Sequence, residues 1–211
     1  MPKTVVDRFE QRRQTRAKLI DAALQLFSTS GYEHATVDDI SQAAGYSKGA
    51  YYFHFSTKED ILLELLRMWA ETRAQILAAA EGEAQTTDSL QELVAEFFSY
   101  AQEPRWPAVL LEFWSQALRN DEVRRRLDQA YGSYRAELTR AFESASRSTG
   151  RSSDGAAEAA SVTLAAHDGY AVQVAVGAPA AKAMQPDQLA GLIVAPFTQR
   201  AAGEERRTAV R

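Results

Sequence analysis

The sequence lacks several features that each define a class of protein. It has no cysteine, which excludes a disulfide framework, thiolate zinc sites, iron–sulfur clusters and cysteine nucleophiles. No apolar run approaches the roughly 20 residues that span a bilayer, and the polar N-terminus has no hydrophobic signal-peptide core. We therefore expect a soluble, cytoplasmic protein.

An excess of basic charge is also missing. The 211 residues include 24 Lys and Arg against 28 Asp and Glu, a net charge of −4, which argues against indiscriminate binding to nucleic acid. The charge is unevenly distributed, because residues 1–20 hold six basic and two acidic side chains and residues 61–211 hold 16 and 20. A local basic site at the N-terminal end is therefore compatible with the acidic total.

Apolar residues recur at helical spacing through almost the whole chain. In residues 8–30 the apolar stripe consists of Leu19, Ala22, Ala23, Leu26 and Phe27. The same periodicity predicts a short helix over about residues 37–44, a second short helix after Ser47 and a long helix after the cap at Thr57. Further helices are predicted over about residues 88–102, 106–118, 121–148, 156–176 and 185–199, with a frayed end at 203–211. No strand or hairpin signal appears. The pattern predicts an all-α fold of about nine helices.

Two short helices near the N-terminus have clear start and stop signals. Thr36 and Asp39 have the spacing of a capping box, Ser47 can cap the next helix, and Gly45 marks the turn between them. Two short capped helices around a glycine turn are the layout of a helix-turn-helix unit. There, the first helix offers N–H groups to a phosphate and the second enters the major groove.

The residues of this region closely resemble the TetR family of transcriptional regulators, over roughly residues 12–62. The matching stretches are Gly31-Tyr32, Thr36-Val37-Asp38-Asp39-Ile40, Ala43-Ala44-Gly45-Tyr46-Ser47-Lys48-Gly49-Ala50, Tyr51-Tyr52-Phe53-His54-Phe55 and Lys58-Glu59-Asp60-Ile61-Leu62. The resemblance implies an N-terminal three-helix DNA-binding unit in residues 1–56. It also implies a C-terminal helical domain for ligand binding and dimerisation in residues 57–211.

The resemblance also implies which residues contact DNA. They are Arg12, Arg13, Arg16, Thr36, Ser47, Lys48, Gly49, Tyr51, Tyr52, Phe53, His54 and Lys58. Thr36, Tyr52, His54 and Lys58 are expected at phosphates, and Ser47, Lys48 and Gly49 at base edges and flanking phosphates. Phe53 is placed to touch a thymine methyl group, and the arginines to follow the backbone or enter the minor groove. Tyr51 stands where the family often has an aliphatic residue, so it either packs in the core or reaches DNA.

The middle helices concentrate aromatic residues, which favours a pocket for a hydrophobic or aromatic small molecule. The predicted ligand contacts are Leu66, Trp69, Arg73, Phe97, Trp106, Leu110, Phe113, Trp114, Tyr131, Tyr134, His167 and Tyr170. Asp168 is a further polar candidate. No metal-ligand spacing is visible, so neither a metal nor a cofactor is expected.

The last two long helices are the best candidates for a homodimer interface. Residues 156–176 are nearly uncharged and rich in small side chains, and family precedent places these helices between the two subunits. The predicted interface residues are Val162, Ala165, Val172, Val176, Leu189, Leu192 and Ile193.

These features predict a ligand-responsive regulator. The leading hypothesis is a repressor that binds a palindromic double-stranded DNA operator as a dimer and is released by its ligand. A transcriptional activator of the same fold stays open, as does a dimer module that has lost DNA binding, although the intact DNA-contact set argues against the latter. An all-α enzyme using the aromatic pocket is disfavoured, because His34, His54 and His167 lie far apart in sequence and no cysteine is present.

Overall fold

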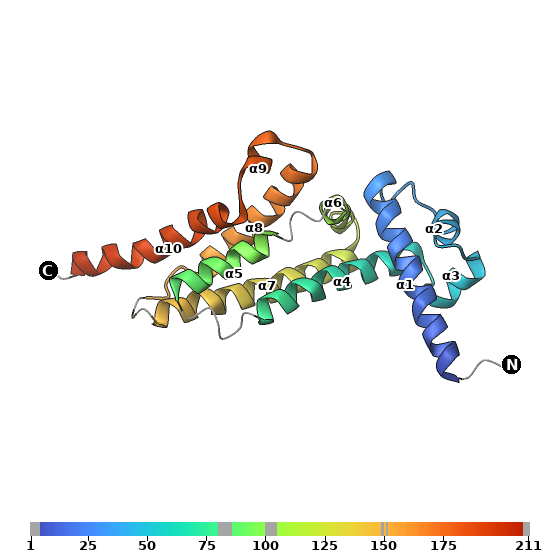
Figure 1. Cartoon of the computed structure of the whole chain (residues 1–211), viewed down its shortest axis with the longest axis horizontal. Helices are drawn as coiled ribbons and strands as arrows, with labels where there is room; N and C mark the ends of the chain where they lie inside the picture. Colours follow the sequence, from blue (N-terminus) through green and yellow to red (C-terminus); the bar gives the residue numbers. More distant parts are fainter. Residues whose placement is uncertain (1–4, 80–85, 100–104, 149, 151, 209–211) are drawn as a thin grey trace. The chain divides into compact units, whose positions relative to one another are not determined.

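A computed structural model describes residues 5–79, 86–99, 105–148, 150 and 152–208, without the side chains of 5–8, 76, 78, 79 and 198–208. Every regular element in this part of the chain is an α-helix, as predicted (Figure 1). The helices are α1 (Val5–Ser30), α2 (Val37–Ala43), α3 (Lys48–His54), α4 (Lys58–Ala79), α5 (Thr87–Ser99), α6 (Trp106–Ala117), α7 (Asp121–Ser148), α8 (Ala156–Ala175), α9 (Pro179–Ala183) and α10 (Pro186–Thr208).

Two differences from the predicted helices stand out. The short helix α9 begins with Pro179 and was not foreseen, because five residues are too few to show periodicity. The helix α10 continues to Thr208, so the expected frayed end at 203–208 is wrong, and its Ala, Glu and Arg residues are good helix formers. The predicted end of the fifth helix, residues 100–102, and residues 209–211 lie outside the described residues.

Contacts divide the chain into two compact units. The first consists of residues 1–69 and 108–127, and the second of residues 70–107 and 128–211. This grouping is not the linear division at residue 56, since α6 and the first turns of α4 and α7 join the helix-turn-helix in the first unit. The DNA-binding boundary at residue 56 stays a prediction.

In the first unit, α1, α2 and α3 pack against one another. The core under them includes Leu19, Phe27, Ile40 and Phe55, all nearly inaccessible to water. Gly31 and Gly45 end α1 and α2 with φ values of 82° and 75°, a region that L side chains rarely adopt. The two glycines therefore set the directions in which α2 and α3 leave their turns.

In the second unit, α10 lies along α5 and also contacts α8 (Figure 1). The buried face of α10 carries Ala190 and Val194, and that of α8 carries Leu164 and Tyr170. Both helices are apolar on their outer faces too, where Val162, Val176 and Leu192 are 56%, 74% and 66% exposed. In a single chain these apolar side chains of the outer surface stay exposed to solvent.

Candidate DNA-binding surface and effector site

The start of α2 is a complete capping box, as predicted. The Thr36 hydroxyl accepts the Asp39 N–H at 3.2 Å, and the Asp39 carboxylate accepts the Thr36 N–H at 2.9 Å and the Thr36 hydroxyl at 2.6 Å. These bonds hold the pKa of Asp39 below its usual value. They also leave Thr36 exposed, with the positive end of the helix dipole open to solvent. A phosphate contact at Thr36 stays a prediction.

The start of α3 lies next to the start of α2. Ser47 caps α3 by accepting the Ala50 N–H at 3.3 Å, and Gly49 is exposed on its first turn. The Lys48 ammonium lies 3.3 Å from a carboxylate oxygen of Asp38 in α2. The structure thus brings Thr36, Ser47 and Lys48 to one end of the two short helices. Asp38 was not predicted as part of this site, because spacing alone does not show which side chain Lys48 reaches.

A second group forms where the first half of α1 meets the end of α3. The Arg12 guanidinium lies 5.0 Å from the centroid of the Phe53 ring, and the Arg16 guanidinium lies 5.1 Å from that of Phe55. The His54 ring packs edge-on against Phe53 at 5.0 Å. Partial burial, together with Arg16 and Arg12, lowers the pKa of His54, so its imidazole is neutral at pH 7. A phosphate contact by His54 stays a prediction.

Arg13 lies on the same helix but points to a different partner. Its guanidinium makes two bonds to the Glu10 carboxylate, of 3.1 Å and 3.0 Å, in an exposed i,i+3 pair. An exposed pair of this kind contributes little to stability, so Arg13 can change partner readily. Lys3 and the side chain of Arg8, which add to the basic N-terminal end, lie outside the described residues.

Arg16 also ties α1 to α4. Its guanidinium lies 2.8 Å from Glu64, which accepts a second bond from Arg67 at 2.7 Å. Burial alone would raise the pKa of Glu64, but the bonds from Arg67 and Arg16 outweigh it and the pKa lies below its usual value. Glu64 is only 11% exposed, which makes this pair stronger than the surface ones. Arg16 is thereby held in place on the side of α1 that faces α4.

Tyr51 and Tyr52 are neighbours in sequence with opposite environments. The Tyr51 side chain is 0% exposed and donates its hydroxyl to the Thr57 carbonyl at 2.9 Å, and burial raises its pKa. A fully buried ring does not reach DNA, so the prediction of Tyr51 as a DNA contact is wrong and its core alternative is correct. Tyr52 is 56% exposed and Phe53 is 62% exposed, which leaves both available to a partner.

Lys58 makes contacts within the protein that were not foreseen. Its ammonium donates to the carbonyls of Tyr32 and Glu33, at 2.7 Å and 3.3 Å, and lies 4.2 Å from the centroid of the Tyr32 ring. From α6, the Gln116 amide donates to the Glu33 carboxylate at 2.8 Å. The turn between α1 and α2 is therefore held by the first residue of α4 and by the end of α6. A phosphate contact by Lys58 stays a prediction, beside this structural role.

The predicted ligand contacts are divided between the two units. In the first unit, Trp69 and Phe113 pack edge-to-face with centroids 6.3 Å apart. Leu66 and Leu110 are also buried in this unit, whereas Trp114 is 44% exposed. In the second unit lie Arg73, Phe97, Trp106, Tyr131, Tyr134, His167 and Tyr170, of which all except Trp106 are buried.

The second unit contains a buried polar cluster around His167. The His167 Nδ1 atom lies 3.2 Å from an oxygen of Asp168, whose other oxygen accepts a short hydrogen bond from the Tyr131 hydroxyl. Burial lowers the pKa of His167, and the nearby Arg73 adds to the decrease. The His167 Nε2 atom is buried with no hydrogen-bond partner among the described residues. Leaving such an atom unsatisfied costs about 1–3 kcal/mol.

Aromatic rings enclose the same imidazole. The Phe97 and Phe98 centroids lie 4.4 Å and 5.8 Å from that of His167, and Tyr170 packs edge-on against Phe98 at 5.9 Å. Asp168 was predicted as a polar candidate, whereas Phe98 was absent from the predicted ligand contacts. The position of Phe98 beside Phe97 in sequence was the available signal. The cluster offers apolar rings together with a few convergent polar atoms, which is the composition of a small-molecule site.

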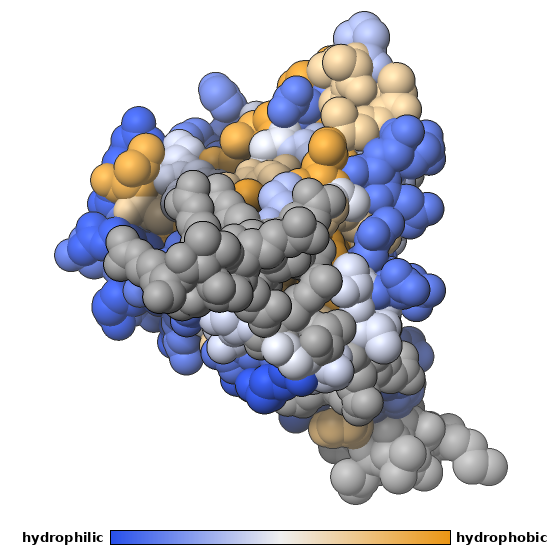
Figure 2. All heavy atoms as spheres, turned by 90° about the vertical axis from the view of Figure 1, so that its left-hand side faces the viewer, coloured by the Kyte–Doolittle hydropathy of each residue, from blue (hydrophilic) through white to orange (hydrophobic). Residues whose placement is uncertain are grey.

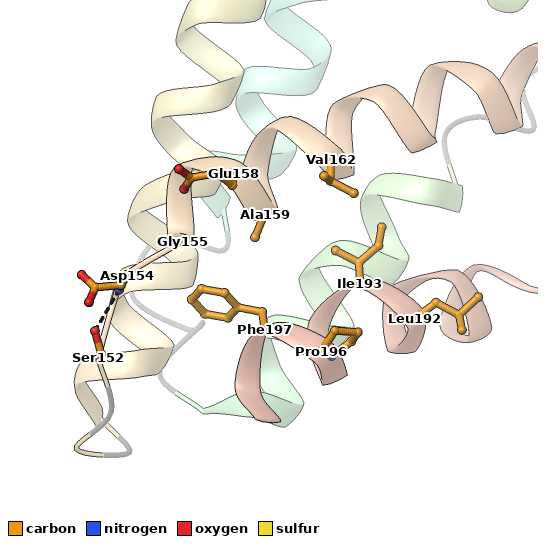
Figure 3. Close-up of a pocket in the computed structure, with 10 residues that line it drawn as sticks. All are labelled: Ser152, Asp154, Gly155, Glu158, Ala159, Val162, Leu192, Ile193, Pro196 and Phe197. Atoms are coloured by element: carbon orange, nitrogen blue, oxygen red, sulfur yellow. Dashed lines mark hydrogen bonds between the residues drawn. The ribbon is translucent and has the colours of Figure 1, made fainter. Parts of the chain in front are cut away.

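A groove of about 620 Å³ lies between the start of α8 and the middle of α10. Val162 of α8 and Ile193 of α10 face the same space, and the ring of Phe197 lies near Ala159 (Figure 3). In Figure 2, hydrophobic residues lie exposed among hydrophilic ones on the side of the molecule that faces the viewer. Of the predicted interface residues, Val162, Ala165, Val176 and Leu192 are exposed, and Val172, Leu189 and Ile193 are partly exposed.

Neither a metal site nor a membrane span is found in the described part of the chain. No group of three or more His, Asp or Glu side chains is arranged to hold a metal ion there. None of the described helices has a stretch apolar and long enough to traverse a lipid bilayer.

Comparison with known proteins places both parts of the chain. Residues 19–65 match the bacterial regulatory proteins of the tetR family, and residues 84–195 match the C-terminal part of BetI-type transcriptional repressors. The regulator BetI of Rhizobium meliloti is 32% identical over 114 residues, which cover 53% of this chain and 56% of BetI. The repressor AcnR of Corynebacterium diphtheriae is 31% identical over 106 residues, covering 50% and 51%. The chain thus matches about half the length of these relatives.

The fold has a close counterpart among solved structures. A transcriptional regulator from Pseudomonas aeruginosa PAO1 superposes with a TM-score of 0.77 at 24% identity, covering 94% of each chain. This likeness extends the match to the order of the helices along almost the whole sequence. The C-terminal family match alone spans more than half of the chain. With its helix-turn-helix and this helical C-terminal part, the chain belongs to the TetR family of bacterial regulatory proteins, which are DNA-binding transcription regulators and not enzymes.

Proposed function

We propose that this protein is a cytoplasmic repressor that binds a palindromic operator as a homodimer and is released by a hydrophobic or aromatic ligand. The observation that carries the proposal is the pair of capped helix starts in the first unit. There Thr36, Ser47 and Lys48 gather at one end of α2 and α3, with Tyr52 exposed on α3. Two such units with a two-fold relation match two half-sites of a palindrome.

A gel-shift titration with the promoter DNA beside the gene tests DNA binding. Tyr52→Ala and Lys48→Ala each remove one exposed contact, and we expect the affinity to fall about ten- to a hundredfold, since a charge-assisted bond to phosphate is worth roughly 1.5–3 kcal/mol. Lys182→Ala removes an exposed lysine of α9 and is the matched control. Equal binding by all three variants and the wild type would contradict the proposal.

Repression is favoured over activation by the relatives. AcnR is named a repressor, and the family that matches residues 84–195 is described as repressors. A reporter fused to the same promoter shows whether the protein represses or activates transcription. Deleting the gene raises reporter output if the protein represses, and lowers it if the protein activates.

The outer faces of α8 and α10 support the dimer. Fully burying an aliphatic side chain contributes about 1.5–3 kcal/mol, so a partner covering Val162 and Leu192 is favoured. Leu192→Glu places a charge in this surface, and we expect size-exclusion chromatography with light scattering to show a mass near the 23.3 kDa of one chain. Leu118→Glu alters a residue just after α6 that is 81% exposed, and we expect it to stay dimeric. A dimeric Leu192→Glu protein would refute this interface.

Release by a ligand requires that the ligand bind the DNA-incompetent state more tightly. Lys58 at the start of α4 donates a hydrogen bond to the turn between α1 and α2. Further along, the same helix carries the predicted ligand contacts Leu66, Trp69 and Arg73. Adding a candidate ligand to the gel shift tests this link. A ligand that binds the protein but leaves the operator complex intact would contradict the proposed release.

A further inference from the structure

The polar network around His167 determines which of its ring nitrogens carries a proton. A carboxylate only accepts hydrogen bonds, so the His167 nitrogen facing Asp168 at 3.2 Å, Nδ1, is the protonated one. Asp168 is itself held by the Tyr131 hydroxyl on its other oxygen. Burial and the neighbouring Arg73 keep the imidazole neutral. The remaining nitrogen, Nε2, is therefore an acceptor without a proton.

This acceptor is unused within the described part of the protein. His167 is 1% exposed, and Nε2 has neither a described hydrogen-bond partner nor contact with water. The other buried polar side chain of the same helix is satisfied, because the Thr163 hydroxyl donates to the Ala159 carbonyl at 2.8 Å. The Tyr170 hydroxyl likewise donates to the Met184 carbonyl at 3.0 Å. His167 Nε2 thus differs from its neighbours on α8 in having an open acceptor.

The surroundings restrict what binds there. The acceptor needs an O–H or N–H donor, which an ionised carboxylate lacks. Arg73, which is buried, and Asp168, whose side chain is 19% exposed, carry opposite charges near His167, so this pair adds no net charge for a charged ligand to balance. The rings of Phe97 and Phe98 beside the imidazole favour a flat aromatic partner.

We infer that His167 Nε2 selects the effector, accepting a hydrogen bond from a neutral aromatic molecule that carries a hydroxyl group. This inference rests on the proposed function, because it names the chemistry of the ligand that the regulator senses. It makes His167 a specificity-determining residue. A purely apolar ligand of the same shape leaves Nε2 unsatisfied and binds more weakly.

Two probes that differ only in the donor test this inference. Isothermal titration calorimetry of the full chain with 1-naphthol and with 1-methoxynaphthalene compares a hydroxyl with its methyl ether. We expect naphthol to bind at least about tenfold more tightly, the value of one buried hydrogen bond. His167→Phe keeps a ring but removes the acceptor, and we expect it to bind both probes alike. Equal affinity of the wild type for both probes, or binding of neither, overturns the inference.

Two further variants separate selection from a structural role. His167→Gln restores an acceptor, and we expect it to regain part of the preference for naphthol. Thr163→Val removes a satisfied buried hydroxyl one turn earlier on α8, and we expect it to keep the full preference. Loss of the preference in Thr163→Val together with His167→Phe means that His167 acts only through packing, which overturns the inference. If His167→Phe does not fold, as judged by circular dichroism, the two-probe comparison on the wild type decides.

The outcome is distinguishable from failure of the proposed function. Naphthol that binds with the expected preference but leaves the operator complex intact refutes ligand release and leaves the role of His167 standing. Release of the operator by both probes at equal concentration refutes the role of His167 and leaves the ligand-responsive repressor standing.

Discussion

Tyr51→Phe and Tyr52→Phe, one residue apart, separate stability from DNA binding. The hydroxyl of Tyr51 is buried and donates to the Thr57 carbonyl at 2.9 Å, just before the start of α4. Removing a neutral hydrogen bond of this kind costs about 0.5–1.5 kcal/mol. For a chain of this size each kcal/mol corresponds to about 2–4 °C in melting temperature. We therefore expect Tyr51→Phe to melt a few degrees lower and to bind its operator with wild-type affinity.

Tyr52→Phe has the opposite expectation. Its ring is 56% exposed, so loss of the hydroxyl leaves the melting temperature within error of the wild type. If this hydroxyl binds a phosphate, the operator affinity falls several-fold. Differential scanning fluorimetry and fluorescence anisotropy with labelled operator DNA measure the two quantities on the same samples. The reasoning fails if Tyr51→Phe weakens DNA binding at an unchanged melting temperature.

Three other changes have expected effects on stability. Gly31→Ala forces a side chain into φ +82° with its Cβ 3.1 Å from a carboxylate oxygen of α6, and chemical denaturation should show a loss of about 1–2 kcal/mol. Gly132→Ala in the middle of α7 meets no atom within 4 Å, and the same assay should show a gain of about 0.5–1 kcal/mol; a loss would mean that this face is covered. Burial, and to a lesser extent Arg73, lowers the pKa of His167 from 6.5 against the opposing effect of Asp168. The stability contributed by the neutral imidazole is therefore complete above that pH and is lost on acidification, because only the unfolded chain takes up the proton. Melting curves from about pH 7.5 to 5.5 should therefore fall less steeply for His167→Phe than for the wild type, and parallel curves would contradict the burial of a neutral imidazole.

Helix ends were the most predictable part of the fold. Thr36 and Asp39 have the spacing of a capping box, and the predicted reciprocal bonds form. Thr57 and Asp60 have the same spacing and form the same bonds before α4. Asn120 caps α7 through two backbone N–H groups. A local signal of this kind needs no knowledge of the tertiary structure, which is why the capping box at Thr36 is confirmed.

The direction of a side chain on a short helix was not predictable in the same way. The helix α3 has only seven residues, so periodicity does not tell whether Tyr51 or Tyr52 faces the core. The packing of α3 against α1 and α2 makes that choice. Lys58 is a similar case, since its carbonyl partners Tyr32 and Glu33 lie more than twenty residues away in sequence.

Most residues of the buried polar cluster around His167 were predicted, but the hydrogen bonds that connect them were not. Arg73, Tyr131 and His167 were selected as aromatic or polar residues of the middle helices, and the structure buries all three in the second unit. That Asp168 links Tyr131 to His167, and so leaves one nitrogen as an acceptor, depends on how α7 and α8 pack. Sequence spacing carries no information about a contact between residues 37 positions apart.

The pairing of basic side chains in the DNA-binding unit has a consequence for the salt dependence of operator binding. Lys48 and Arg13 lie against Asp38 and Glu10 before any DNA arrives. We propose that each turns to a phosphate when DNA binds, with its former carboxylate partner still nearby and offsetting part of the new attraction. Fewer counterions are then released from the DNA than the number of basic residues suggests, so the slope of log K against log salt is shallow. Specific contacts thus contribute a larger share of the affinity than in a protein whose cations have no internal partners.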